Sequence, residues 1–105
     1  MRDSFIIMVI LKIQTTIFPE KMTEFEQAMN HLLQFDEEKK LKYLKGFYQE
    51  WHNPNAFFYL EEWENDAKLQ LHLKSESFKA FIGAMKVLGE IVSAKVIHTS
   101  QIEDL

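Results

Sequence analysis

The sequence has no cysteine and very little glycine or proline, which argues against several classes of function. Without cysteine there is no disulfide framework, no thiolate nucleophile and no cysteine-ligated zinc site. Three glycines and two prolines leave no glycine-rich loop for phosphate groups, so we expect no nucleotide cofactor. The histidines show no metal-ligand spacing, so we expect no metal site. They are His31, His52, His72 and His98.

Long apolar runs and blocks of one charge are also missing. The run from Phe5 to Leu11 is too short to cross a bilayer and lacks the flanks of a signal peptide. The formal net charge is −4, from 16 acidic and 12 basic residues, and no basic stripe indicates nucleic-acid binding. We therefore expect a cytoplasmic protein that binds neither membranes nor nucleic acids.

Aromatic residues, in contrast, are plentiful, with nine Phe, three Tyr and two Trp among 105 residues. A chain of this length is expected to form a single domain over residues 1–105, with its core at about 5–102. Such a domain buries only about 60–70% of the surface that its unfolded chain exposes. The rings therefore either fill one dense core or are covered in part by a second subunit.

Hydrophobic periodicity predicts the element order β-α-β-β-α-β, with the second helix in two pieces. The predicted strands are 5–16, 41–51 with a bulge at Gly46, 57–64 and 92–102. The first predicted helix follows Pro19, with its apolar stripe starting at Met22, and runs to about 34; the others run from Asn65 or Asp66 to about 74 and from Ser75 or Ser77 to Gly89. We expect a solvated connection at 36–40 and a turn at 53–55, where Pro and Asn favour turn geometry.

This order is typical of the ferredoxin-like α+β fold, in which helices cover one face of an antiparallel sheet. Apolar residues occupy both faces of the predicted strands, since Phe58 and Leu60 alternate with Tyr59 and Trp63. The face without helices then needs another cover, and a second copy of the sheet is the simplest one. We therefore predict a homodimer.

Several residues of the second hairpin strand and the following helices are candidates for a site. Glu61 shares a strand face with Tyr59 and Trp63, and a carboxylate beside buried aromatics must be paired or protonated. Glu61 is either an acid or base or a structural partner, and Trp63 either stacks on a planar ligand or belongs to the core. His72, on the next helix, is either a proton acceptor or a packed histidine.

The order and spacing of these features resemble the antibiotic biosynthesis monooxygenase (ABM) domain family. The resemblance covers about Val9 to Ile102. The residues that carry it are Pro19, Phe25, the Asn53-Pro54-Asn55 hairpin, Glu61, Trp63, His72-Leu73, Ser75 and Phe78. It implies a dimeric α+β barrel with a pocket between the sheet and the helices of each subunit.

Some members of that family oxidise polycyclic phenols or quinols with O₂ and no metal, flavin or haem. The resemblance therefore implies a cofactor-independent monooxygenase acting on a small aromatic or quinol-type substrate, with His72 as proton acceptor. Trp63, Tyr59, Phe78 and Phe81 are then the substrate-binding candidates, and Glu61 is a weaker catalytic one. The chain departs from many members at Ser77, where a second His often stands. The alternatives are a non-catalytic barrel that binds a small molecule or regulates a partner, and a pure dimerisation unit.

Haem cleavage, known from other relatives, is disfavoured. Those relatives use an Asn on the first strand, a Trp on the helix after the hairpin, and an iron-binding His ten residues later. Here residues 1–18 contain no Asn, His72 occupies the Trp position, and Ile82 stands where the iron ligand should be.

Overall fold

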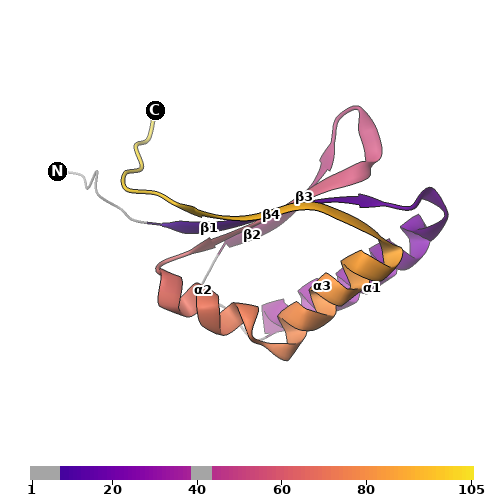
Figure 1. Ribbon diagram of the computed structural model, residues 1–105, viewed down its shortest axis with the longest axis horizontal. Helices are drawn as coiled ribbons and strands as arrows, with labels where there is room; N and C mark the ends of the chain where they lie inside the picture. Colours follow the sequence, from indigo (N-terminus) through magenta and orange to yellow (C-terminus); the bar gives the residue numbers. More distant parts are fainter. Residues whose placement is uncertain (1–7, 39–43) are drawn as a thin grey trace.

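The computed structural model describes residues 8–38 and 44–105, which form an antiparallel sheet with helices on one side (Figure 1). The strands are β1 (Val9–Ile17), β2 (Leu44–Glu50), β3 (Asn53–Trp63) and β4 (Gly89–His98). The helices are the short 3₁₀ turn η1 (Pro19–Lys21), α1 (Met22–Glu38), α2 (Asp66–Leu73) and α3 (Glu76–Leu88). The strand order is β2-β3-β1-β4, and every neighbouring pair is antiparallel. This confirms the predicted ferredoxin-like α+β fold.

The predicted helix boundaries are right where capping residues mark them. Asn65 caps α2 by accepting a hydrogen bond from the Lys68 backbone N–H, and Ser75 caps α3 through the Phe78 N–H. The predicted connection at 36–40 is wrong as far as Glu38, because α1 continues to that residue. Glutamate is a good helix former, so polar composition alone did not indicate a loop. Residues 39 and 40 lie outside the described residues.

The hairpin between β2 and β3 turns earlier than predicted. Its loop is Trp51-His52, and residues 53–55 already belong to β3, with Glu50 paired to Asn53. The Asn53 side chain accepts from the Asn55 N–H, while the Pro54 carbonyl accepts from the Gln49 amide. Proline is tolerated here because it stands at the start of a strand. Trp51 sits in the turn, 90% exposed, and not in the strand.

The bulge and the last strand also lie at other positions than predicted. No bulge occurs at Gly46, which pairs with Leu60, and the β2–β3 register changes instead between Gln49 and Glu50. The last strand begins at Gly89 and ends at His98, so it starts and finishes earlier than predicted. The predicted start of the first strand at residues 5–7 and of the second at 41–43 lies outside the described residues.

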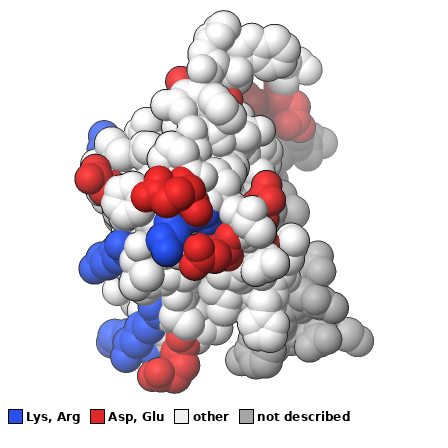
Figure 2. Space-filling view, turned by 90° about the vertical axis from the view of Figure 1, so that its right-hand side faces the viewer, with Lys and Arg blue, Asp and Glu red and all other residues white. Residues whose placement is uncertain are grey.

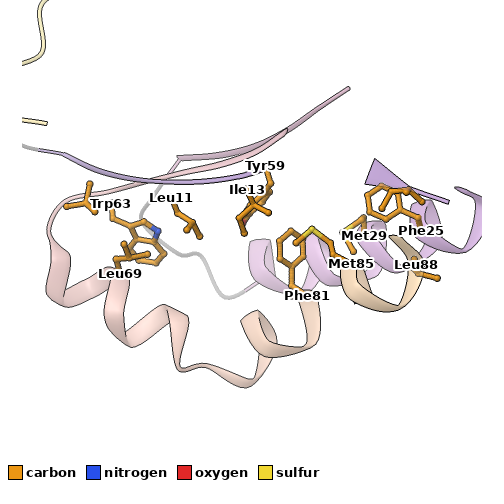
Figure 3. Packing of buried hydrophobic residues seen from close by; sticks show 12 residues of the cluster. Leu11, Ile13, Phe25, Met29, Tyr59, Trp63, Leu69, Phe81, Met85 and Leu88 are labelled. Carbon is orange, nitrogen blue, oxygen red and sulfur yellow. The ribbon is translucent and has the colours of Figure 1, made fainter. Parts of the chain in front are cut away.

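The core fills the space between the sheet and its helices. In β1 every second residue is buried from Val9 to Ile17, and these residues face the helices. Figure 3 shows the cluster as a band beneath the sheet, with Trp63 and Leu69 at one end and Phe25 and Met29 at the other. The chain's own helices therefore pack against this face of the sheet.

The opposite face, which we call the outer face, carries no helix in the part of the chain described (Figure 1). Strand alternation and pairing place apolar side chains on it, because Ile10 pairs with Ile97 and Phe58 pairs with Tyr48. Tyr48 is 55% exposed and Ile97 is 39% exposed. The predicted two-sided apolar character of the sheet is thus present in the structure.

Charged side chains of both signs are interspersed on the end of the molecule that carries the β2–β3 turn, as Figure 2 shows. Lys21 and Glu24 form one exposed ion pair there, at 3.5 Å. None of the described helices is long and apolar enough to cross a membrane.

Candidate functional site

Strand β3 brings three of the candidate side chains to the inner face of the sheet. Tyr59, Glu61 and Trp63 are spaced by two residues, so their side chains point to the same side of the strand. All three are buried, and Glu61 has no exposed surface at all. Glu62 faces the other way, as expected, and pairs with Ile10.

Helix α2 brings His72 to the same place. The helix follows β3 after a two-residue connection and is capped by Asn65, so its direction is set at the first turn. Leu69 and His72 are its buried residues, and their three-residue spacing places them on one helical face. His72 is 8% exposed.

The four side chains form one hydrogen-bonded group, which we call the Glu61 cluster: Tyr59, Glu61, Trp63 and His72. The Trp63 indole N–H donates to Glu61 Oε1 at 2.9 Å. The Tyr59 hydroxyl hydrogen-bonds Glu61 Oε2, and His72 Nε2 lies 2.9 Å from the same oxygen. A carboxylate with several hydrogen-bond partners is the arrangement that makes burial of this group tolerable.

With Glu61 ionised, one assignment of protons satisfies the whole cluster. The indole N–H of Trp63 can only donate, so Glu61 Oε1 is an acceptor. An ionised Glu61 accepts on Oε2 from both Tyr59 and His72, which requires a proton on His72 Nε2. In this assignment the carboxylate orients the imidazole through Nε2.

Aromatic rings surround the cluster. His72 has ring neighbours in Trp63 and Phe78, each with a centroid separation of 4.9 Å. Phe81 packs against Tyr59 with the ring centroids 4.5 Å apart. Phe81 lies on the buried face of α3, and Phe78 is partly buried at the edge of that face. Rings therefore restrict the motion of His72 and limit its contact with water.

A hollow of about 370 Å³ lies elsewhere on the inner face, between α1 and the β2–β3 hairpin. Its apolar lining consists of Phe25, Met29, Phe47 and Phe57. Its polar lining consists of Glu26, Asn30 and Gln49. No residue of the Glu61 cluster lines it. The Phe47 ring separates the two places, because it contacts Phe25 and Phe57 within the hollow and Tyr59 beyond it.

The structure brings all six residues singled out from the sequence into one neighbourhood, namely Tyr59, Glu61, Trp63, His72, Phe78 and Phe81. Their roles toward a substrate stay predictions. The polar atoms of Tyr59 and Trp63 hydrogen-bond Glu61, a contact that the sequence did not indicate. The resemblance implied a pocket between the sheet and the helices, but the residues that line this hollow were not singled out, since they come from three separate elements. The helical stripe that contains Phe25 and Met29 was the only signal for it.

A second histidine, which would be expected at position 77, is replaced by a serine with a structural role. The Ser77 hydroxyl lies 3.3 Å from that of Ser75, which donates to the His72 carbonyl at 2.7 Å. Among residues 8–38 and 44–105, no three His, Cys, Asp or Glu side chains converge on a metal-sized site.

Comparisons with known proteins bear on this site. The family model described as antibiotic biosynthesis monooxygenase matches residues 8–84. No curated protein matches the sequence. A conserved protein of Methanosarcina mazei Go1 has a similar structure over 92% of this chain and 95% of its own, at 23% identity and a TM-score of 0.74.

Two further structures are similar. A conserved protein of Bacteroides thetaiotaomicron VPI-5482, described as of unknown function and a possible oxidoreductase, is 17% identical over 93% of this chain and 100% of its own, with a TM-score of 0.74. A structure described as an antibiotic biosynthesis monooxygenase is 19% identical over 90% of this chain and 99% of its own, with a TM-score of 0.72. At these identities the structural likeness establishes the fold alone.

Proposed function

The chain belongs to the antibiotic biosynthesis monooxygenase family, and on this basis we propose that it is a cofactor-independent monooxygenase of small phenol- or quinol-type aromatics. The observation that carries the proposal is the contact between His72 Nε2 and the fully buried Glu61 carboxylate. Such a pair can take a proton from a bound ring and hold it as an imidazolium.

The reaction that this proton transfer would start is balanced without an external reductant. Loss of a hydroxyl proton to His72 makes the ring an electron-rich anion that reduces O₂ itself. One oxygen atom bonds to a ring carbon and the other leaves as water, so a phenol and O₂ yield a quinone and water. The protein has to bind the ring, orient the base and exclude water. The aromatic surroundings of His72 suit the last of these tasks.

Within this scheme each residue of the Glu61 cluster has its own task. His72 accepts the proton, and Glu61 orients and stabilises the imidazolium that results. Tyr59 and Trp63 hold Glu61 through its two oxygens. The face of the Trp63 ring is the proposed platform for a planar substrate, with Phe78 and Phe81 at its margin.

The same proposal includes a homodimer. Proteins of this family are typically dimeric. In this chain the outer face supports the idea, because Tyr48 and Ile97 would otherwise leave apolar surface in contact with water. Two copies pressed together through their outer faces would cover both sets of side chains and leave each inner face to its own helices.

Oxygen consumption with a panel of hydroquinones and naphthols tests the enzymatic proposal. We expect turnover by the wild-type protein and a loss of about 10²–10⁴-fold in His72→Ala, the range that a general base contributes. His31→Ala is the matched control, since His31 is exposed on α1 and should have no effect. Equal rates for wild type and His72→Ala would remove His72 from the mechanism.

A second candidate function is a barrel that binds a small molecule without turnover. The hollow favours it, because this apolar space of about 370 Å³ is lined by neither His72 nor Tyr59. If a member of the panel binds and none of them gives oxygen uptake, this second function is supported.

A further inference from the structure

We propose that the hollow between α1 and the β2–β3 hairpin is a second small-molecule site, one that takes an uncharged aromatic ring bearing hydroxyl groups. Its volume of about 370 Å³ falls within the range of small-molecule pockets, roughly 300–1,000 Å³. The site does not depend on the monooxygenase step, since no residue of the Glu61 cluster lines it.

Aromatic rings make up most of the apolar wall. Phe47 meets Phe25 edge-on at 5.4 Å and Phe57 edge-on at 5.5 Å, so the three rings brace one another. Phe25 is only 3% exposed and Met29 only 4%, which anchors this side of the wall in the core. A rigid aromatic wall next to a flexible thioether suits a flat ring better than a branched aliphatic molecule.

The polar part of the lining offers both hydrogen-bond acceptors and donors, since Asn30 and Gln49 carry amides. The Gln49 amide nitrogen donates to the Pro54 carbonyl at 2.8 Å, which fixes the amide and leaves its carbonyl oxygen and its second N–H for a ligand. Glu26 adds two carboxylate oxygens from the exposed face of α1. An aromatic hydroxyl group both donates and accepts, so it can pair with the amides and with the Glu26 carboxylate.

The charge of the lining also limits which ligands the hollow can bind. Among the described residues that line the hollow, Glu26 is the one with a charge, and the formal net charge of the chain is −4. A ligand with a carboxylate would approach the like charge of Glu26. The hollow should therefore discriminate between a hydroxylated ring and a carboxylated ring of the same size.

Position separates this site from the proposed catalytic one. Phe25 and Met29 lie at the end of the core opposite Trp63 (Figure 3). Between them stand the Phe47 and Tyr59 rings, with their centroids 5.6 Å apart. A ligand in the hollow should thus change the surroundings of Met29 before those of Trp63.

Binding under anaerobic conditions tests the proposal without any turnover. The probes are 2,6-dihydroxynaphthalene and naphthalene-2,6-dicarboxylate, and the readout is the ¹³C-labelled methyl resonance of Met29. We expect the diol to shift this resonance in a saturable way and the dicarboxylate to bind at least about tenfold more weakly. A diol that shifts other methyl resonances and leaves that of Met29 in place would overturn the site.

Two charge reversals on α1 test the recognition of charge. Glu26→Lys should raise the affinity for the dicarboxylate by about fivefold or more, the effect expected of a nearby exposed charge. Glu24→Lys is the matched control, because it changes the net charge equally from an exposed position outside the lining. Equal effects of the two variants, or equal binding of the two probes by the wild type, would refute the proposed selectivity. Oxygen uptake tests the proposed monooxygenase activity separately.

Discussion

Replacing Glu61 by leucine should destabilise the protein strongly, although leucine is apolar and similar in size. The carboxylate is fully buried and accepts from Trp63 and from His72, in addition to its contact with Tyr59. Removing the acceptor of a buried hydrogen bond costs about 1–3 kcal/mol, so three bonds amount to about 3–9 kcal/mol. Relief from burying a charge offsets part of this sum. We expect the free energy of unfolding of Glu61→Leu to fall by about 3 kcal/mol or more.

Glu61→Gln should behave differently, because the amide keeps one acceptor oxygen for Trp63. Its NH₂ group then faces Tyr59 and His72, and both of these can accept instead of donate. We expect a loss of stability of only about 1 kcal/mol. The proton on His72 Nε2 should be lost as that nitrogen becomes an acceptor, and oxygen uptake should fall far more than stability does.

Denaturation at one fixed protein concentration measures the stabilities, since a dimer's stability depends on concentration. The ¹⁵N chemical shift of His72 Nε2 reports its protonation in wild type and Glu61→Gln. Glu62→Gln is the matched control, because Glu62 is the next residue and faces away from the cluster. A Glu61→Leu variant within about 0.5 kcal/mol of wild type would refute the claim that these hydrogen bonds hold the site together.

Three further predictions concern the fold. Leu60→Lys, on the outer face, should convert the proposed dimer to monomer in sedimentation at micromolar concentration, and an unchanged sedimentation coefficient would argue against that interface. Gly89→Ala should cost about 2 kcal/mol or more in a denaturant titration, because its Cβ would overlap the backbone at Thr16 and Ile17. Ser75→Ala should cost about 1 kcal/mol by removing the N-cap of α3, whereas Ser100→Ala should cost nothing measurable.

Much of the fold was predictable because local chemistry and hydrophobic period agreed. The alternation in β1 predicted its buried residues, and Asn65 and Ser75 marked the helix starts through their side-chain caps. The predictions were less accurate where two local preferences compete. The glutamates near the end of α1 were predicted to lie in a solvated connection, although glutamate is a good helix former. Pro54 was predicted to lie in a turn, but it stands near the start of a strand.

The candidate site was predictable in part for the same reason. The spacing of Tyr59, Glu61 and Trp63 by two residues places them on one face of any strand, whatever surrounds it. That these three side chains would meet His72 depends on how α2 folds back after Asn65, which is a tertiary contact across eleven residues. The hollow depends on even more distant elements, because α1 and the hairpin both contribute to it.

The amino-acid sequence by itself determined the element order, the apolar character of both sheet faces and the membership in a family, since each follows from periodicity or from residues at fixed spacing. Only the tertiary structure decided that Glu61 and His72 share a hydrogen bond and that Phe25, Phe47 and Phe57 enclose a separate space. The physical reason is that spacing along the chain fixes which way a side chain points, whereas packing between elements fixes what it meets.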